Sequence, residues 1–193
     1  NAFTGKEQTC YYFKVLDEHY GTASELLQQM LLYSLFSPAD VAKEKNVVLE
    51  ELRMYEDSPE ELVHDLFANI LWPEDPLGRN IIGSHETISG FTPEMIREYM
   101  KKHYTGDRLV IASAGNISHK QVVDTFGAAF DFLPQGSMPQ LAKANHRSQQ
   151  GCFQDKDIEQ VHLCLGGPAL CRHDQRRYAL SLLDTMIGGG VSS

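Results

Sequence analysis

The sequence predicts an α+β fold in which a β-sheet is covered by helices. Two β-prone runs, TCYYFKVL at residues 9–16 and RLVIASAG at residues 108–115, are separated by longer segments whose apolar residues recur at helical spacing. Apolar residues repeated every three or four positions indicate helices that bury one face. Strands interleaved with such helices are typical of a sheet that helices cover.

Length and composition exclude several classes of protein. The chain has 193 residues, of which 42% are hydrophobic and 22% charged, enough for a core in one or two domains. Its formal net charge of −9 argues against a nucleic-acid partner, which would need a basic face. No apolar run approaches the roughly 20 residues of a membrane span, so we expect no membrane partner. Four cysteines without a CxxC spacing favour a reducing compartment, and we expect a cytoplasmic protein.

The elements follow from local signals. SPADVAKEKNVVLEELRMYED predicts a helix because Ser37 can cap it and Pro38 suits its first position. SPEELVHDLFANILW, residues 58–72, repeats that signature. In chain order we expect a strand at 9–16 that continues a segment from Asn1, helices at 22–35, 37–57, 58–72 and from Thr92 to Tyr104, a strand at 108–115, a helix at 118–130, a strand and turn at 159–170, and a helix at 174–190.

The chain is expected to divide at a polar, irregular stretch. Residues 134–150 read PQGSMPQLAKANHRSQQ, a composition typical of a linker. We therefore predict a first domain at 1–133, and at 151–193 the beginning of a second.

Glu44 and Glu51 are the candidate functional residues of the helix at 37–57. Seven residues apart, they share one side of it. They fall between two apolar groups, so we expect them to interrupt the packed stripe, where an unpaired carboxylate is costly to desolvate. One interpretation is that arginines or water satisfy both acids at its edge. The other is a catalytic or metal site. The apolar groups are Val41, Val48, Leu52 and Tyr55, and then Val47 and Met54.

Other histidines and cysteines form weaker patterns. VLDEH at 15–19 lacks the first histidine of an HxxEH motif. A second set, two histidines and two cysteines between positions 162 and 173, has residue types that suit zinc but lacks the knuckle spacing of structural zinc sites. The alternative to a zinc site is a buried cysteine in a strand and a surface histidine. We expect His64 and His103 to be solvated. The second set is His162, Cys164, Cys171 and His173.

Four stretches taken together resemble the pitrilysin/insulinase family of zinc metallopeptidases (inverzincins), with most similarity to its bacterial, mitochondrial-processing-peptidase-like branch. They are NAFTGKEQTCYYFKVL, EKNVVLEELRMYEDSPEELVHD, PLGRNIIGSHETISGF and YMKKHYTGDRLVIASAGNI. The resemblance covers nearly the whole chain. It implies a bacterial metallopeptidase half-domain of the pitrilysin/processing-peptidase type, followed by the start of a second, structurally related domain.

The resemblance also implies a role for each acid. Zinc would be bound by two histidines of an HxxEH helix and by Glu51, while Glu44 would support the catalytic site, for instance by orienting a histidine ligand. Residues Asn1, Ala2, Phe3 and Thr4 match an edge strand to which a substrate peptide adds by main-chain hydrogen bonds. The HxxEH motif would lie about 75 residues before Glu51, ahead of Asn1. We therefore expect an internal fragment that is inactive alone.

The implied activity is zinc-dependent hydrolysis of peptide bonds in unfolded peptides. An unfolded peptide is thus the expected partner, and a homodimer is a further expectation. The alternative is a non-catalytic scaffold or peptide-binding subunit with the same fold.

Overall fold

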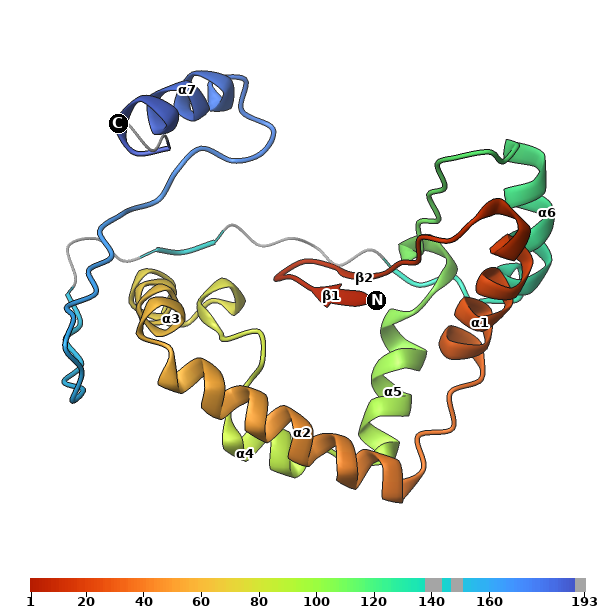
Figure 1. Ribbon diagram of the computed structural model, residues 1–193, viewed down its shortest axis with the longest axis horizontal. Helices are drawn as coiled ribbons and strands as arrows, with labels where there is room; N and C mark the ends of the chain where they lie inside the picture. The colour runs from red at the N-terminus through yellow and green to blue at the C-terminus, as the bar shows by residue number, and fades with distance from the viewer. Residues whose placement is uncertain (138–143, 147–150, 190–193) are drawn as a thin grey trace. The chain divides into compact units, whose positions relative to one another are not determined.

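A computed structural model describes residues 1–137, 144–146 and 151–189 of the chain. Over these residues the structure is mostly helical and contains one small sheet (Figure 1). The elements are β1 (Ala2–Thr4), β2 (Thr9–Tyr11), η1 (Asp17–His19), α1 (Tyr20–Leu32), α2 (Pro38–Asp57), α3 (Pro59–Leu71), η2 (Pro76–Gly78), α4 (His85–Gly90), α5 (Pro93–His103), η3 (Gly106–Arg108), α6 (His119–Phe130) and α7 (Arg177–Ile187).

Most helices begin where the sequence predicts them, because their capping residues act locally. The side chain of Ser37 accepts a hydrogen bond from the Asp40 amide at 3.2 Å and so caps α2. Thr92 caps α5 in the same way. Ser118 and Gln121 cap α6 reciprocally. Helix α1 ends three residues before the predicted end at residue 35.

The sheet is smaller than predicted. β1 and β2 pair antiparallel, with Ala2 opposite Tyr11 and Thr4 opposite Thr9. The strand predicted at 9–16 is therefore confirmed only as far as Tyr11. An α+β fold is compatible with this architecture, but over the described residues the sheet has two strands.

The strands predicted at 108–115 and 159–170 are wrong for the described residues, which have no strand there. The side chains of Val110 and Val161 are 89% and 96% exposed. A β-prone run becomes a strand only when a neighbouring strand bonds its backbone and an apolar layer covers its side chains. Neither is present around these segments in the described structure.

Contacts group the chain into two units, which we describe separately. The first comprises residues 1–58 and 80–143 and the second residues 59–79 and 144–193. In the first unit, α2 packs against α4 and α1 against α6; in the second, α3 packs against η2 and buries Leu71. The buried apolar residues of the first unit are Val41, Leu52, Ile88 and Phe126.

The predicted domains at 1–133 and 151–193 stay a prediction. The linker predicted between them at 134–150 lies largely outside the described residues. Within the described part of the chain, no helix is both long enough and apolar enough to cross a membrane.

Candidate metal site on helix α2

Helix α2 packs through one face. Val41 and Leu52 are buried, while Lys45, Val48 and Leu49 are half-buried. At 100° per residue these five positions span about 100° of the helix circumference, with Leu52 at the centre. This is the face that packs against α4.

Glu44 and Glu51 lie beside this packed face. Both side chains are exposed, and so is Val47 between them, at 44%. The prediction that the acids interrupt the buried stripe is therefore wrong for the described structure. They lie about 80–100° around the helix from the centre of that stripe. With Met54, which is 73% exposed, these residues form a continuous strip that we call the acidic strip.

In the described part of the chain, the two carboxylates of the acidic strip are not paired with a cation. Among the residues that the structure describes, neither Glu44 nor Glu51 forms an ion pair or a hydrogen bond through its side chain. The neighbouring Glu50 differs, because Arg53 lies 2.5 Å from its carboxylate on the polar side of α2.

The spacing of the two acids limits what they can do together. Seven residues of helix place them about 10 Å apart along the axis, whereas a carboxylate oxygen lies about 2.0–2.2 Å from a bound zinc ion. To hold one ion directly, both side chains would have to extend toward each other along the helix. A metal site on this strip would use one acid as a direct ligand, and the other acid would contact one of the remaining ligands.

A single exposed carboxylate fits zinc by its chemistry but does not complete a site. Catalytic zinc is commonly held by three protein ligands. The described residues contain no group of three His, Cys, Asp or Glu side chains placed to hold a metal. Further ligands for an ion bound at Glu51 would therefore come from outside the described residues.

β1 presents an open edge. The main-chain groups of Asn1 and Gly5 bond to the opposite arm of the hairpin, at 2.9 and 2.8 Å. Since bonding sides alternate along an antiparallel strand, Ala2 and Thr4 direct their N–H and C=O groups to the other edge. All four predicted residues, Asn1–Thr4, are exposed, and no strand in the described structure covers that edge.

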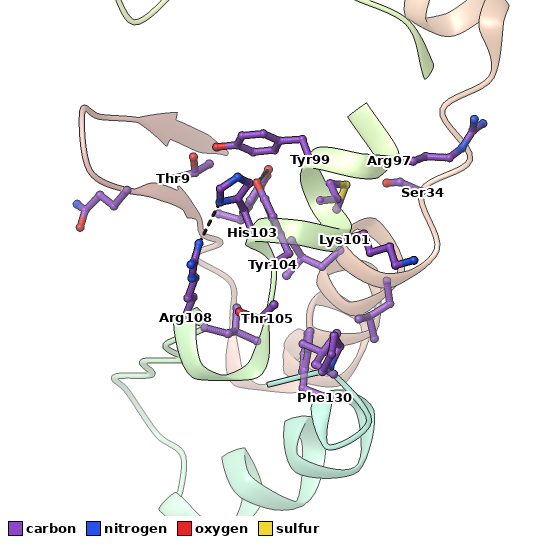
Figure 2. A pocket seen from close by; sticks show the side chains of 18 of the residues that line it. Thr9, Ser34, Arg97, Tyr99, Lys101, His103, Tyr104, Thr105, Arg108 and Phe130 are labelled. Atoms are coloured by element: carbon purple, nitrogen blue, oxygen red, sulfur yellow. Dashed lines mark hydrogen bonds between the residues drawn. The ribbon is translucent and has the colours of Figure 1, made fainter. Parts of the chain in front are cut away.

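A cavity of about 650 Å³ lies in the first unit beside the β1–β2 hairpin (Figure 2). Arg97, Lys101, His103, Tyr104 and Arg108 are among its lining residues. Helix α5 and the segment after it supply these side chains, and the hairpin closes one side. Sequence reasoning did not group these residues with the hairpin, because no local pattern links segments almost a hundred positions apart.

His103 is not simply solvated, as predicted, but half-buried. Its ring centroid lies 4.5 Å from that of Tyr99, and Arg108 Nη1 lies 2.9 Å from His103 Nδ1 (Figure 2). A guanidinium only donates, so Nδ1 accepts and the proton is on Nε2. Burial, followed by the charges of Arg108 and Lys102, lowers the pKa of His103. These surroundings therefore favour the neutral imidazole.

The cysteine and histidine set does not form a zinc site in the described structure, which contains no group of three potential ligands. Cys164 instead approaches His64, with its Sγ 3.9 Å from His64 Nδ1. His64 is exposed, as predicted.

Two family models together match nearly the whole chain. The model described as Insulinase (Peptidase family M16) matches residues 1–85. The model described as Peptidase M16 inactive domain matches residues 90–193. The first match includes both β1 and the acidic strip of α2.

Curated bacterial relatives named as zinc proteases align with the whole chain. The uncharacterized zinc protease YmxG of Bacillus subtilis is 42% identical over 193 residues, and that of Streptomyces coelicolor is 39% identical over 201 residues. Each alignment covers 100% of this chain but 47% and 44% of the respective relative. The chain thus spans about half the length of these curated relatives.

Solved structures share the fold. The peptidase M16 inactive domain from Pseudomonas fluorescens matches with a TM-score of 0.57 and 22% identity, over 67% of this chain and 31% of that one. The periplasmic protease PqqL from Escherichia coli matches with a TM-score of 0.58 and 17% identity, over 68% and 15%. With the two family models, these matches confirm the predicted resemblance: the chain belongs to peptidase family M16, the insulinase family.

Proposed function

We propose that the protein is a zinc-dependent endopeptidase, and that this chain supplies one zinc ligand and part of the substrate-binding surface. The observation that supports this most is the placement of Glu44 and Glu51 on one side of a regular, well-capped helix, within the residues that the insulinase model matches. Membership of family M16 and relatives named zinc proteases favour a metal over an arginine as the missing partner.

Glu51 is the proposed zinc ligand and Glu44 the supporting acid. When bound, zinc supplies Lewis-acid polarisation of the scissile carbonyl and an activated water. Glu51 would contribute one anionic oxygen and Glu44, about two helical turns away, would accept a hydrogen bond from the outer N–H of a histidine ligand. That bond fixes the tautomer and the orientation of the histidine ring.

β1 is the proposed docking strand for substrate. Ala2 and Thr4 offer main-chain donors and acceptors on the open edge, so an extended peptide can add as a further strand. Pairing through the main chain requires an unfolded segment but no particular sequence. Phe3, 50% exposed, offers a ring against which a substrate side chain can pack.

A non-catalytic scaffold or peptide-binding subunit is the second candidate. It is favoured by the match of residues 90–193 to a model described as an inactive domain. Such a subunit would keep the open edge of β1 and bind peptides, but it would neither hold zinc tightly through Glu51 nor cleave.

Glu51→Gln in the full-length protein tests the assignment. The amide keeps the size of the side chain but loses its anionic charge, so we expect peptide cleavage to be abolished and zinc content, measured by atomic emission, to fall. Glu44→Gln should lower cleavage about 10- to 100-fold, the usual cost of losing an outer-shell partner. Glu50→Gln is the matched control, because Glu50 pairs with Arg53 on the polar side of α2. Equal effects of Glu50→Gln and Glu51→Gln would contradict the proposal.

Peptide is the only partner that we propose. The homodimer and the cytoplasmic location stay predictions, and the structurally similar PqqL is named as a periplasmic protease.

A further inference from the structure

The connection that leads into α2 has an unusual backbone. Residues 33–37 join α1 to α2, and Phe36 has a φ of 45°. A bulky residue other than glycine rarely adopts a positive φ, because its Cβ crowds the neighbouring carbonyl. Such a conformation persists only where surrounding contacts hold it. The start of α2 therefore depends on contacts made to this connection.

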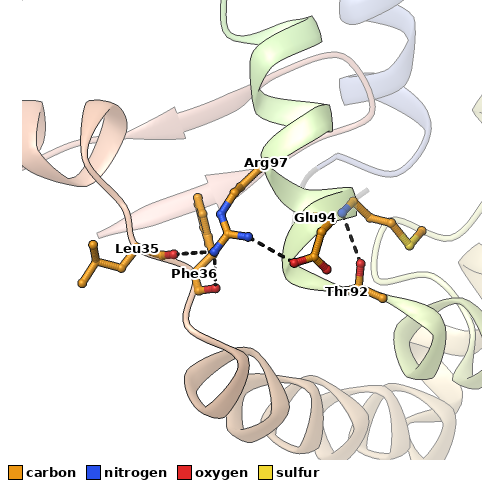
Figure 3. A network of polar contacts seen from close by, with 6 residues as sticks. Leu35, Phe36, Thr92, Glu94 and Arg97 are labelled. Carbon is orange, nitrogen blue, oxygen red and sulfur yellow. Dashed lines mark hydrogen bonds and ion pairs between the residues drawn. The ribbon is translucent and has the colours of Figure 1, made fainter.

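Arg97 of α5 makes those contacts (Figure 3). Its Nη2 donates to the carbonyl oxygens of Leu35 at 2.9 Å and Phe36 at 3.0 Å. Its Nη1 lies 3.3 Å from Glu94, one turn earlier on α5. The Arg97 side chain is 48% exposed, so the contact depends less on burial than on the guanidinium fork, in which Nη2 faces the two carbonyls and Nη1 faces Glu94.

Glu94 fixes the other side of the guanidinium. Its own backbone amide, followed by the Thr92 hydroxyl, lowers the pKa of Glu94, so the carboxylate stays charged beside Arg97 under acidic conditions in which a free glutamate would protonate. The N-terminal cap of α5 thus helps to orient Arg97, which binds the connection before α2.

Lys45 makes the reciprocal contact from α2. Its Nζ lies 2.5 Å from the carbonyl oxygen of Ser89 and 3.2 Å from that of Phe91. These carbonyls belong to the last turn of α4 and the residue after it, where helical carbonyls lack intrahelical partners. Each of two cations thus binds a pair of carbonyls on the other segment, Lys45 from α2 and Arg97 from α5.

We propose that Lys45 and Arg97 are positioning residues that set the axial position and rotation of α2, and through them the place of Glu51. The proposal rests on the proposed function of Glu51 as a zinc ligand. A shift of α2 by one residue moves every side chain about 1.5 Å along the axis and turns it about 100°, whereas ligand distances are held within about 0.2 Å. Apolar packing against α4 tolerates small sliding far better than a metal site does.

The test measures zinc affinity, kcat and KM for a peptide, and the urea midpoint of unfolding, all in the full-length protein. We expect Arg97→Gln and Lys45→Met each to weaken zinc binding by about tenfold or more, as outer-shell changes commonly do. They should also lower kcat with little change in KM, because β1 is untouched. Arg53→Gln and Lys43→Met are the matched controls, since both cations lie on the exposed polar side of α2.

A second substitution separates positioning from general stability. In the Arg97→Gln background, Phe36→Gly should recover part of the lost zinc affinity, because glycine adopts a positive φ without strain and so keeps the entry to α2. Arg97→Lys keeps the positive charge but has one ammonium nitrogen in place of the separate Nη1 and Nη2 donors, so it should give an intermediate zinc affinity. This variant also replaces Arg97→Gln in the test if Arg97→Gln does not fold.

Two results are decisive. If Arg97→Gln and Lys45→Met lower the urea midpoint while zinc affinity stays at the level of their controls, the two residues only stabilise the fold and the positioning role is overturned. If Glu51→Gln, measured in parallel, also leaves zinc affinity and cleavage unchanged, the proposed function itself fails.

Discussion

Tyr104 keeps its phenolic proton to a higher pH than a free tyrosine does, because the folded chain disfavours the charged phenolate. Burial, followed by the hydrogen bond with Tyr11, whose hydroxyl lies 3.1 Å away, raises the pKa of Tyr104 to about 12. A raised tyrosine pKa means that the folded state prefers the neutral phenol. The resulting stability is fully present below pH 10, the usual pKa, and is lost as pH rises from 10 to about 12.

Tyr11→Phe should therefore lower the pKa of Tyr104 while leaving it above 10, since burial remains. Alkaline titration followed by tyrosinate absorbance measures the pKa of Tyr104. Urea unfolding between pH 9 and pH 12 should show that the wild-type chain loses this stability only above pH 10. Tyr12→Phe is the matched control, because the Tyr12 ring lies near Phe3 instead, with 6.4 Å between ring centroids. A Tyr104 titration unaffected by Tyr11→Phe would show that the hydrogen bond carries none of the shift.

Helical periodicity predicts the relation between Glu44 and Glu51 but not their burial. Their shared side follows from seven residues of helix. Their burial depends on which element covers that side, and Val47 and Met54 look like core residues in the sequence although both are exposed in the described structure. An apolar residue at helical spacing marks a side of the helix that can pack, without showing which element packs on it.

At the scale of elements, helix starts are the most predictable feature. Ser37, Thr92 and Ser118 each bind an amide within their own first turn, so four consecutive residues are enough to recognise the cap. Strands are less predictable, because their hydrogen bonds go to distant segments. The runs at 108–115 and 159–170 have strand composition but no strand beside them in the described structure.

Thr4→Pro tests the role of the open edge of β1. Proline removes the N–H that Thr4 directs away from β2, so a substrate strand loses one main-chain hydrogen bond. At about 1 kcal/mol for such a bond, we expect KM for a peptide substrate to rise about fivefold with zinc content unchanged. Thr4→Val, which keeps the N–H and the shape of the side chain, should behave as wild type. An equal rise in KM for both variants would assign the effect to the side chain.

At the scale of the whole molecule, the chain covers about half of its relatives and contributes a single proposed zinc ligand. One carboxylate holds zinc weakly, so a chelator should leave the thermal midpoint of the 193-residue chain unchanged. The full-length protein should lose stability, by about 2.7 kcal/mol if free zinc had been at 100 times its Kd. Thermal unfolding with and without EDTA measures both. A midpoint that falls for the 193-residue chain alone would reopen the site of His162, Cys164, Cys171 and His173.

The exposed segment at 161–165 affects whether copies of this chain associate in solution. Val161, Leu163 and Leu165 are 96%, 86% and 92% exposed, and they alternate with half-buried residues. Three exposed aliphatic side chains at every second position, on a main chain that pairs with no strand in the described structure, allow copies of the chain to pair as β-strands. We therefore expect concentrated solutions of the isolated chain to self-associate through this stretch, and Leu163→Lys to reduce that association, as measured by light scattering.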